Sequence, residues 1–433
     1  MKRYPKYKDS GVPWLGQVPE HWEITRLSRV AREVGTKNKG MAERNLLSLS
    51  YGRIIRKDIE ANEGLLPASF EGYQIVEDGD TVLRLTDLQN DQRSLRTGYV
   101  TERGIITSAY SALRPMGLSR RWLFNVLRAS DLLKVFYSMG GGVRQSLDYE
   151  GIKRLAVLMP PSAEQDAIDA YLVAEEARIA KAIDSQERMI ELLKERRSAI
   201  ITQAVTKGLN PKAKMKDSGV PWLGQVPAHW EVRPLKSLAW SPGTLFIDGD
   251  WIESENISDA GIRYLTSGNV GEGLYKEQGA GFITPETFQE LNCEEVFPRD
   301  VLISRLNLPI GRACVVPDLG QRIVTCVDNV ILRTNGSFSP NFLAYLFSSK
   351  THFDNMETLG RGSTMLRISR TTLGNVRFAF PPFNEQLSIV KYLDAVVAEL
   401  DSTISSQERM IELLKERRSA IITQAVTGQI DVR

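Results

Sequence analysis

The sequence predicts an α+β protein in which two strand-rich α/β domains alternate with two long helices. The helices are expected to pair as an antiparallel coiled coil, which gives the chain pseudo-two-fold symmetry. Three observations predict this fold: the chain contains an internal repeat, the segments between the repeated parts carry short strand patterns, and a long helical pattern ends each repeat. At 433 residues the chain is long enough for about three domains of ordinary size.

Two nearly identical kinds of segment make up the repeat. Residues 8–23 read KDSGVPWLGQVPEHWE, and residues 216–231 repeat them with Ala228 as the single change. We call each of these segments a strap. Residues 185–206 recur at 406–427 without a substitution. An identity of 22 residues is too long for chance, so the chain is a tandem duplication of strap, middle region and long helix.

The expected parts follow that order along the chain. They are a first domain with its strap, a first long helix, a second domain with its strap, and a second long helix, at residues 1–158, 159–210, 211–379 and 380–433. Short β-branched and apolar runs bounded by Gly, Pro or Asp predict strands in both middle regions. The middle regions differ while their flanks are identical. Either the identical parts serve one shared partner and the middle regions serve different targets, or the identical parts are recent copies; the first interpretation is favoured.

Both long helices have recognisable ends. Ser162 and Gln165 are spaced as a capping box, Asn384 is the expected N-cap of the second copy, and Gly208 and Gly428 follow the last helical residues. A helix over residues 163–207 spans about 68 Å at 1.5 Å per residue. Because that exceeds one face of a small domain, the two copies are expected to pair with each other.

Two apolar stripes run along each helix. The predicted pairing seam consists of Ile179, Ala182, Gln186, Met189, Leu193, Arg196, Ile200 and Ala204, with its copy at Leu400, Thr403, Gln407, Met410, Leu414, Arg417, Ile421 and Ala425. A second stripe is left over, and an unpaired apolar stripe indicates a partner. Because this stripe occurs twice, two copies of one partner are predicted to dock on Ile190, Ile201, Val205, Ile411, Ile422 and Val426. The alternative is a pair of amphipathic helices that each pack on their own domain.

The composition sets the environment of the protein. Lys plus Arg number 55 and Asp plus Glu number 53, so the net charge is only +2 and any basic surface must be local. Three cysteines without C-x-x-C spacing indicate a reducing compartment. No apolar stretch approaches the roughly 18 residues of a membrane span. We therefore expect a cytoplasmic protein.

The motifs of enzymes and cofactor sites are missing from the sequence. The run Phe380-Pro381-Pro382-Phe383 lacks the Asn or Asp that an adenine methyltransferase needs at its first position. The sequence carries no Gly-x-Gly-x-x-Gly or Walker A loop, so no cofactor is predicted. Its few histidines form no metal-ligand pattern; those of the straps each precede a tryptophan and are interpreted as packed or capping residues. The chain is expected to be no enzyme and to bind no metal.

With enzyme and cofactor motifs missing, recognition of nucleic acid is the function that the sequence still supports. Residues 24–158 carry 21 Lys/Arg against 15 Asp/Glu, whereas residues 232–379 carry 14 against 16. Arg reads guanine, and Asn or Gln reads adenine, in the major groove. Two loops in each middle region offer such side chains, so the candidate DNA-binding residues are Arg84, Thr86, Gln89, Asn90, Arg144, Gln145, Arg305, Asn307, Arg361, Ser363 and Thr364. Solvated turns without a DNA contact are the alternative.

The order of these parts resembles a known family. The strap, the Pro-Pro-x-x-Glu-Gln runs at residues 160–165 and 381–386, and the run Glu-Arg-Arg-Ser-Ala-Ile-Ile-Thr-Gln-Ala-Val-Thr in both long helices are typical of the specificity subunit of type I restriction-modification systems. The resemblance implies that each middle region reads one half of a bipartite DNA target. It implies that the helical coiled coil fixes the spacing and docks two modification (N6-adenine methyltransferase) subunits, which ATP-dependent restriction subunits join.

Two rival functions are weighed against this one. A nuclease or methyltransferase in its own right is disfavoured by the missing motifs. A coiled-coil scaffold without a role at nucleic acid is the other, and failure to shift any DNA, with or without partner subunits, would favour it. The net charge of −2 of the second middle region leaves its phosphate-contacting residues open.

Overall fold

The computed structural model describes residues 2–60, 67, 69–91, 94–139, 146–279, 281–362 and 365–433. The chain forms two compact units. Unit 1 comprises residues 1–186 and 409–433, and unit 2 comprises residues 187–408. Each long helix therefore gives one half to each unit, instead of forming a part of its own between the domains. Among the described helices, none is long and apolar enough to cross a membrane.

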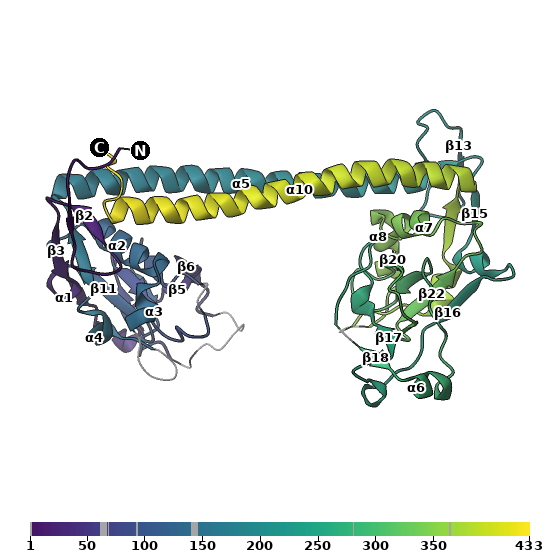
Figure 1. The fold of residues 1–433 in the computed structure, drawn as a ribbon, viewed down its shortest axis with the longest axis horizontal. Coiled ribbons are helices and arrows are strands. Elements are labelled where there is room, and N and C mark those ends of the chain that lie inside the picture. The colour runs from purple at the N-terminus through teal and green to yellow at the C-terminus, as the bar shows by residue number, and fades with distance from the viewer. Residues whose placement is uncertain are drawn as a thin grey trace. The chain divides into compact units, whose positions relative to one another are not determined.

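Unit 1 contains two four-stranded sheets (Figure 1). One has the order β6-β5-β10-β7, from Arg53–Lys57, Leu46–Ser50, Gly104–Ile106 and Gln74–Val76. The other has the order β4-β11-β8-β9, from Ala31–Glu33, Ser111–Pro115, Thr81–Leu83 and Thr97–Tyr99. Two-stranded ladders join β1 (Tyr7–Asp9) to β2 (Gln17–Pro19) and β3 (Glu23–Arg26) to β12 (Ala156–Met159). The helical elements are α1 (Leu27–Val30), η1 (Lys39–Met41), α2 (Arg120–Leu132), α3 (Val135–Met139) and α4 (Tyr149–Ile152).

Unit 2 repeats the general plan, with one strand fewer in its second sheet. A four-stranded sheet has the order β16-β22-β19-β20, from Leu245–Asp248, Asn329–Arg333, Val301–Ser304 and Ala313–Val315. A three-stranded sheet has the order β18-β17-β21, from Phe282–Ile283, Ile262–Leu265 and Ile323–Thr325. The ladders are β13 (Met215–Asp217) with β14 (Gln225–Pro227) and β15 (Glu231–Pro234) with β23 (Arg377–Phe380). The helical elements are η2 (Leu235–Ala239), η3 (Ser254–Asn256), η4 (Ser267–Asn269), α6 (Pro285–Glu290), α7 (Pro340–Leu346), α8 (Lys350–Leu359) and α9 (Arg370–Asn375).

The two long helices are α5 (Ser162–Lys207) and α10 (Phe383–Val426). In unit 1 the first half of α5 lies beside the second half of α10, and in unit 2 the second half of α5 lies beside the first half of α10 (Figure 1). This is the antiparallel pairing that the sequence predicts. Gly208 and Gly428 take φ of 74° and 73° just past the helix ends, as expected of C-terminal glycines.

The predicted N-caps need a correction. Ser162 is the first residue of α5, and Asn384 is the second residue of α10. The side chain of Gln165 does not close a capping box; its amide donates backwards to the carbonyl of Pro160 at 2.8 Å. Gln386 does the same to Pro381 at 2.9 Å. The prolines therefore fix the start of each helix through a glutamine that turns back to them.

The two apolar stripes also differ from the prediction. Met189 and Met410, expected in the seam, are 48% and 46% exposed. The residues expected to dock a partner are buried instead, namely Ile190, Ile201, Val205, Ile411, Ile422 and Val426. Ile201 and Val205 belong to the core of unit 2, and Ile422 and Val426 belong to the core of unit 1. The docking prediction for these six residues is therefore corrected: each helix packs on its partner helix and on the domain beside it, so two stripes are buried.

Candidate nucleic-acid interface

The first candidate loop of unit 1 follows β8. Arg84 is half-buried, and its N–H donates to the carbonyl of Arg96 at 2.8 Å. Asp87 adopts the left-handed conformation, with φ of 57°, and accepts a hydrogen bond from the Asn90 amide at 2.8 Å. Gln89 and Asn90 are exposed at the tip. The loop thus presents amide groups to solvent on a defined backbone.

A buried guanidinium donates hydrogen bonds to the backbone of this loop from inside the domain. The side chain of Arg96 is fully buried and donates to the carbonyls of Thr86 at 2.7 Å and Asp87 at 3.1 Å, and to that of Asp91. Its Nε donates to the hydroxyl of Tyr137 at 3.3 Å. Hydrogen bonds from a charged donor are stronger than neutral ones. In this loop they take the place of the backbone hydrogen bonds that the carbonyls would make within a sheet. Thr86 therefore contributes a carbonyl to the support of the loop.

In unit 2 an arginine supports the corresponding loop in the same way. Ser304 donates its N–H to the carbonyl of Arg312 at 2.8 Å, as Arg84 does to Arg96. The Arg312 guanidinium donates to the carbonyls of Leu306 at 3.0 Å and Asn307 at 2.9 Å, and burial lowers the pKa of Arg312. Asn307 has a φ of 60°, close to that of Asp87, and its side chain is exposed. Two different sequences thus build the same supported loop.

Sequence reasoning missed both supporting arginines. Arg96 lies nine positions after Asp87, whereas Arg312 lies five after Asn307, so no fixed spacing links them. The available signal was an arginine at the start of the next strand, beside β-branched or small residues. Such a position is ordinarily exposed, and only the pairing of strands places it under the loop.

In both units a residue that follows the second candidate loop is hydrogen-bonded to the backbone of the first loop. In unit 1 the N–H of Leu147 donates to the carbonyl of Leu85 at 2.8 Å. In unit 2 the N–H of Ile368 donates to the carbonyl of Arg305 at 3.1 Å. The exposed Arg361 lies on this second loop, paired through backbone hydrogen bonds of 2.9 Å with Arg367.

The N–H of Asn307 donates to the carbonyl of Leu366 at 3.0 Å, which ties the two loops of unit 2 together. The structure therefore brings the segments of Asn307 and Arg361 to one place. Arg144, Gln145, Ser363 and Thr364 lie outside the described residues.

Arg305 requires a correction. Its side chain is buried, its guanidinium donates to the carbonyls of Ile368 at 3.1 Å and Val327, and it pairs with Asp248 at 3.1 Å. Burial lowers the pKa of Arg305. A guanidinium held in this way supports the loop from inside and does not reach a base edge. The prediction that Arg305 is a DNA-reading residue is therefore replaced by a structural role.

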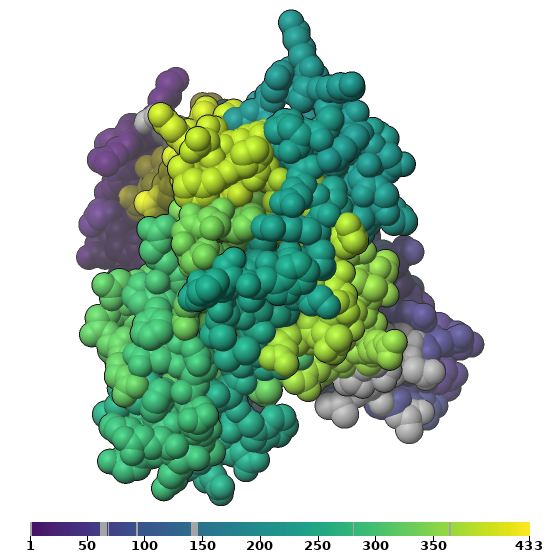
Figure 2. Space-filling model, turned by 90° about the vertical axis from the view of Figure 1, so that its right-hand side faces the viewer, coloured from purple at the N-terminus to yellow at the C-terminus, as the bar shows by residue number. Residues whose placement is uncertain are grey.

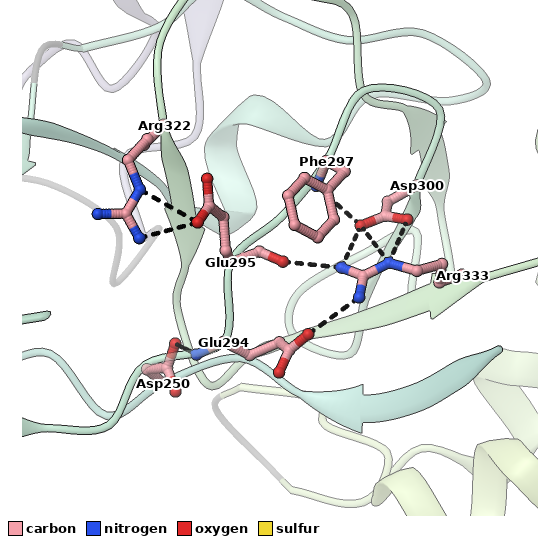
Figure 3. A network of polar contacts seen from close by, with 7 residues as sticks. All are labelled: Asp250, Glu294, Glu295, Phe297, Asp300, Arg322 and Arg333. Carbon is pink, nitrogen blue, oxygen red and sulfur yellow. Dashed lines mark hydrogen bonds and ion pairs between the residues drawn. The ribbon is translucent and has the colours of Figure 1, made fainter. Parts of the chain in front are cut away.

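A buried aspartate, paired with a partly exposed arginine, anchors the strand that leads into each loop. Asp80 accepts two hydrogen bonds from Arg114, at 2.7 and 2.8 Å, just before β8. Asp300 accepts the matching bonds from Arg333 just before β19, at distances of 2.8 to 3.3 Å (Figure 3). Bidentate pairs of this kind fix geometry as well as charge.

Several acidic residues of the second middle region belong to this network. Arg333 also binds the carboxylate of Glu294 at 3.0 Å and the carbonyl of Glu295 at 2.7 Å (Figure 3). The carboxylate of Glu295 accepts from Arg322 at 2.8 Å. This network holds three acids against two arginines, so half of the middle region's net charge of −2 lies within it.

A buried histidine contacts the first loop of unit 2. His352 donates from Nε2 to the carbonyl of Gly311 at 3.0 Å, and burial lowers its pKa to about 4. It packs against the rings of Phe347 and Phe378. Its role is therefore structural. The described residues contain no group of His, Cys, Asp and Glu side chains arranged to hold a metal ion.

The fold and the repeated loops can now be compared with known proteins. A family model described as the type I restriction modification DNA specificity domain matches residues 227–409. The type I restriction enzyme MjaVIII specificity subunit of Methanocaldococcus jannaschii is 20% identical over 425 residues, which covers 96% of this chain and 95% of that protein. The chain is similar to type I specificity subunits along nearly its whole length.

Further relatives agree with this similarity. The EcoKI specificity subunit of Escherichia coli K12 is 22% identical over 216 residues, which is 48% of this chain and 44% of that protein. Among solved structures, the HsdS subunit from Thermoanaerobacter tengcongensis aligns with a TM-score of 0.53 at 17% identity, over 95% of this chain and 98% of that one.

A chain from work on assembly and conformational transition of the type I R-M system aligns with a TM-score of 0.71, also at 17% identity, over 95% of this chain and 99% of that one. These structural likenesses establish the α+β fold of a specificity subunit, with two strand-rich domains and paired long helices.

Proposed function

We propose that this chain is a specificity subunit that recognises DNA and that each middle region reads one half of a bipartite sequence. The observation that carries the proposal is the supported loop found in both units. Arg96 and Arg312 hold equivalent backbones, while the exposed side chains on them differ: Gln89 and Asn90 in unit 1, Asn307 in unit 2. A constant frame with variable polar tips is what reading of two different half-sites requires.

The exposed groups match the chemistry of base edges. An Asn or Gln amide can donate to N7 and accept from N6 of adenine, and Arg can donate twice to guanine. Arg361 lies on the loop that is tied to that of Asn307, so unit 2 offers both kinds of reader together. Arg84, which is half-buried beside the loop, is suited to a phosphate.

The proposal assigns the docking of partners to a surface different from the one that the sequence predicted. We define the exposed helix patch as Met189 and Leu192 on α5 with their copies Met410 and Leu413 on α10. These apolar side chains are exposed and identical in both units. Because the same patch occurs once in each unit, it suits two copies of one partner. We propose that the partners are two modification (methyltransferase) subunits, through which ATP-dependent restriction subunits join.

In this proposal the chain is a non-catalytic recognition subunit that acts in the cytoplasm, where it meets DNA. We also propose that α5 and α10, which are continuous helices shared by both units, set the spacing of the two half-sites. The chemistry of methyl transfer belongs to the partner subunits.

The test is a map of N6-methyladenine across the host genome, with and without this gene. We expect one bipartite motif to lose methylation when the gene is removed and to regain it when the gene is restored. A methylome that is identical in both strains contradicts the proposal. Retained DNA methylation by the isolated chain with S-adenosylmethionine would instead favour an enzyme, and failure of the assembled complex to bind any duplex would favour a scaffold.

A further inference from the structure

A groove between the helix pair and the strand-rich domain occurs at equivalent positions in both units. In unit 1 it has a volume of about 500 Å³ and is lined by Tyr51, Arg53, Arg121, Glu176 and Arg418, among others. In unit 2 it has a volume of about 320 Å³, and its lining includes Arg197, Glu272, Tyr345, Asp394 and Asp401. The groove residues on α5 and α10 correspond one to one, because the repeat is ungapped along both helices.

The two grooves carry opposite charge. The groove of unit 2 has three carboxylates against one arginine, and that arginine is neutralised: the Arg197 Nε lies 2.9 Å from Oδ1 of Asp401. Asp394 accepts a hydrogen bond from the Tyr345 hydroxyl at 2.7 Å. Figure 2 views unit 2 from the side on which the chain that follows α5, in teal, lies against the beginning of α10.

In unit 1 the corresponding helix arginine lacks the two aspartates that line the groove in unit 2. Arg418 is the copy of Arg197, but Ala180 and Val173 stand where Asp401 and Asp394 stand in unit 2. Two of the many differences between the first halves of the two helices thus remove both acids from this groove, and a third, Glu176 in place of Val397, adds one. Glu176 is the one acid that lines it.

Three arginines of this groove lie outside the ion pairs that the described residues form. Among the residues that the structure describes, no ion pair joins Arg53, Arg121 or Arg418 to a carboxylate. The Arg121 guanidinium lies over the ring of Tyr99, with its Cζ 4.8 Å from the ring centre. This stacking orients the guanidinium without neutralising it.

The mouth of the groove is a tight hairpin between β5 and β6. Tyr51 at its tip has a φ of 46° and is 86% exposed. The buried Arg128 donates to the carbonyl of Gly52 at 2.6 Å and to the carbonyl of Thr97 at 2.7 Å, so the tip is fixed to the domain. An aromatic ring held in solvent beside an arginine is suited to contact with a sugar–phosphate backbone.

We propose that the groove of unit 1 binds phosphates of the DNA backbone and that the equivalent groove of unit 2 does not. The inference rests on the proposed function, because it assigns backbone contacts to the half-site read by unit 1. Unpaired guanidinium groups that converge on a groove bind phosphate through charge-assisted, often bidentate hydrogen bonds. The acids of the unit 2 groove repel the same ligand. Electrostatic attachment to DNA is therefore concentrated on one unit.

The experiment measures the affinity of the full-length protein, in its complex with partner subunits, for a mixed-sequence duplex over a series of salt concentrations. The variant is Arg53→Gln combined with Arg121→Gln and Arg418→Gln. Each phosphate contact contributes about 0.9 to the slope of log affinity against log salt, so we expect the slope to fall by about 2 to 3. Arg197→Gln in unit 2 is the matched control and should leave the slope unchanged.

A second variant guards against misfolding. Arg53 is an exposed residue at the hairpin, so Arg53→Gln alone should fold normally and lower the slope by about 1, while Arg53→Lys should restore it. An unchanged slope in both variants overturns the proposal while leaving DNA recognition intact. Loss of partner subunits with an unchanged slope also overturns it, because the groove would then bind an acidic protein surface. Absence of any duplex binding by the unmodified complex would overturn the proposed function as well.

Discussion

The indole of Trp22 donates a hydrogen bond to the carboxylate of Glu164 at 3.1 Å. Trp230 makes the same bond to Glu385, also at 3.1 Å. Trp22 belongs to the strap, and Glu164 belongs to the Pro-Pro-x-x-Glu-Gln run at the start of α5. The two repeated motifs, which are 142 residues apart in the first copy, therefore meet in space. Their repetition in the second copy reflects one contact that each unit needs.

The first prediction concerns this contact. Glu164→Ala leaves the buried Trp22 indole without an acceptor and removes the 2.8 Å contact with His21. A buried donor without a partner costs about 1–3 kcal/mol, so unfolding of unit 1 should shift to lower denaturant concentration. Urea unfolding monitored by tryptophan fluorescence measures the shift. Glu164→Gln, which keeps an acceptor, should lose less; equal losses for both variants would contradict the role of the hydrogen bond.

The second prediction concerns the supporting arginines. Arg96→Ala removes the guanidinium that donates to three loop carbonyls, so the loop of unit 1 should relax and recognition of one half-site should weaken by about 1–3 kcal/mol per lost base contact. Arg312→Ala should affect the other half-site alone. Sequencing of methylated sites in cells that carry each variant gives the motif. If both variants relax the same half, or neither half changes, the loops are not the reading elements.

The third prediction tests the exposed helix patch. Leu192→Glu together with Leu413→Glu should leave folding intact, since both side chains are exposed, and should release the partner subunits. Ile201→Asp instead places a charge in the core of unit 2 and should destabilise the protein itself. Co-purification and thermal unfolding separate the two effects. Full retention of partners by the double variant would mean that docking uses another surface.

The fourth prediction concerns acid. The pKa of His352 is about 4 in the folded protein and about 6.5 in an unfolded chain, so the unfolded state takes up the proton first. The contribution of neutral His352 to the free energy of unfolding is fully present above about pH 7. It is lost as the pH falls from 6.5 towards 4, by roughly 3 kcal/mol in all. Unfolding free energies measured across this range test it. His352→Gln, which cannot titrate, should show a shallower fall; an identical pH profile would refute the assignment.

The fifth prediction concerns the spacing of the half-sites. Inserting seven residues after Gln186 and seven after Glu408 adds two turns to each helix and keeps the seam in register. The insertions lengthen the helices by about 10 Å, which is close to three base pairs at about 3.4 Å each. The methylated motif should keep both halves while its unspecified gap widens. An active variant with the original gap would show that other elements set the spacing.

The sequence by itself determined the order of parts and where each long helix stops. These properties are written in local or repeated patterns: a 22-residue identity, glycines at 208 and 428, and Pro-Pro before each helix. Such patterns act through backbone geometry near the residues themselves. They survive in any tertiary context and can be read directly.

The tertiary structure decided which residues face what. Met189 and Ile190 are neighbours of similar polarity, and only the packing of α5 on both α10 and its domain exposes the first and buries the second. Arg305 and Arg361 look alike in the sequence, yet one is bound by carbonyls and Asp248 while the other is exposed. Hydrophobic periodicity shows that one face of a helix is buried, but it does not show which element covers that face. The charge of an arginine has its effect only through the acids and carbonyls that long-range strand and helix pairing bring beside it.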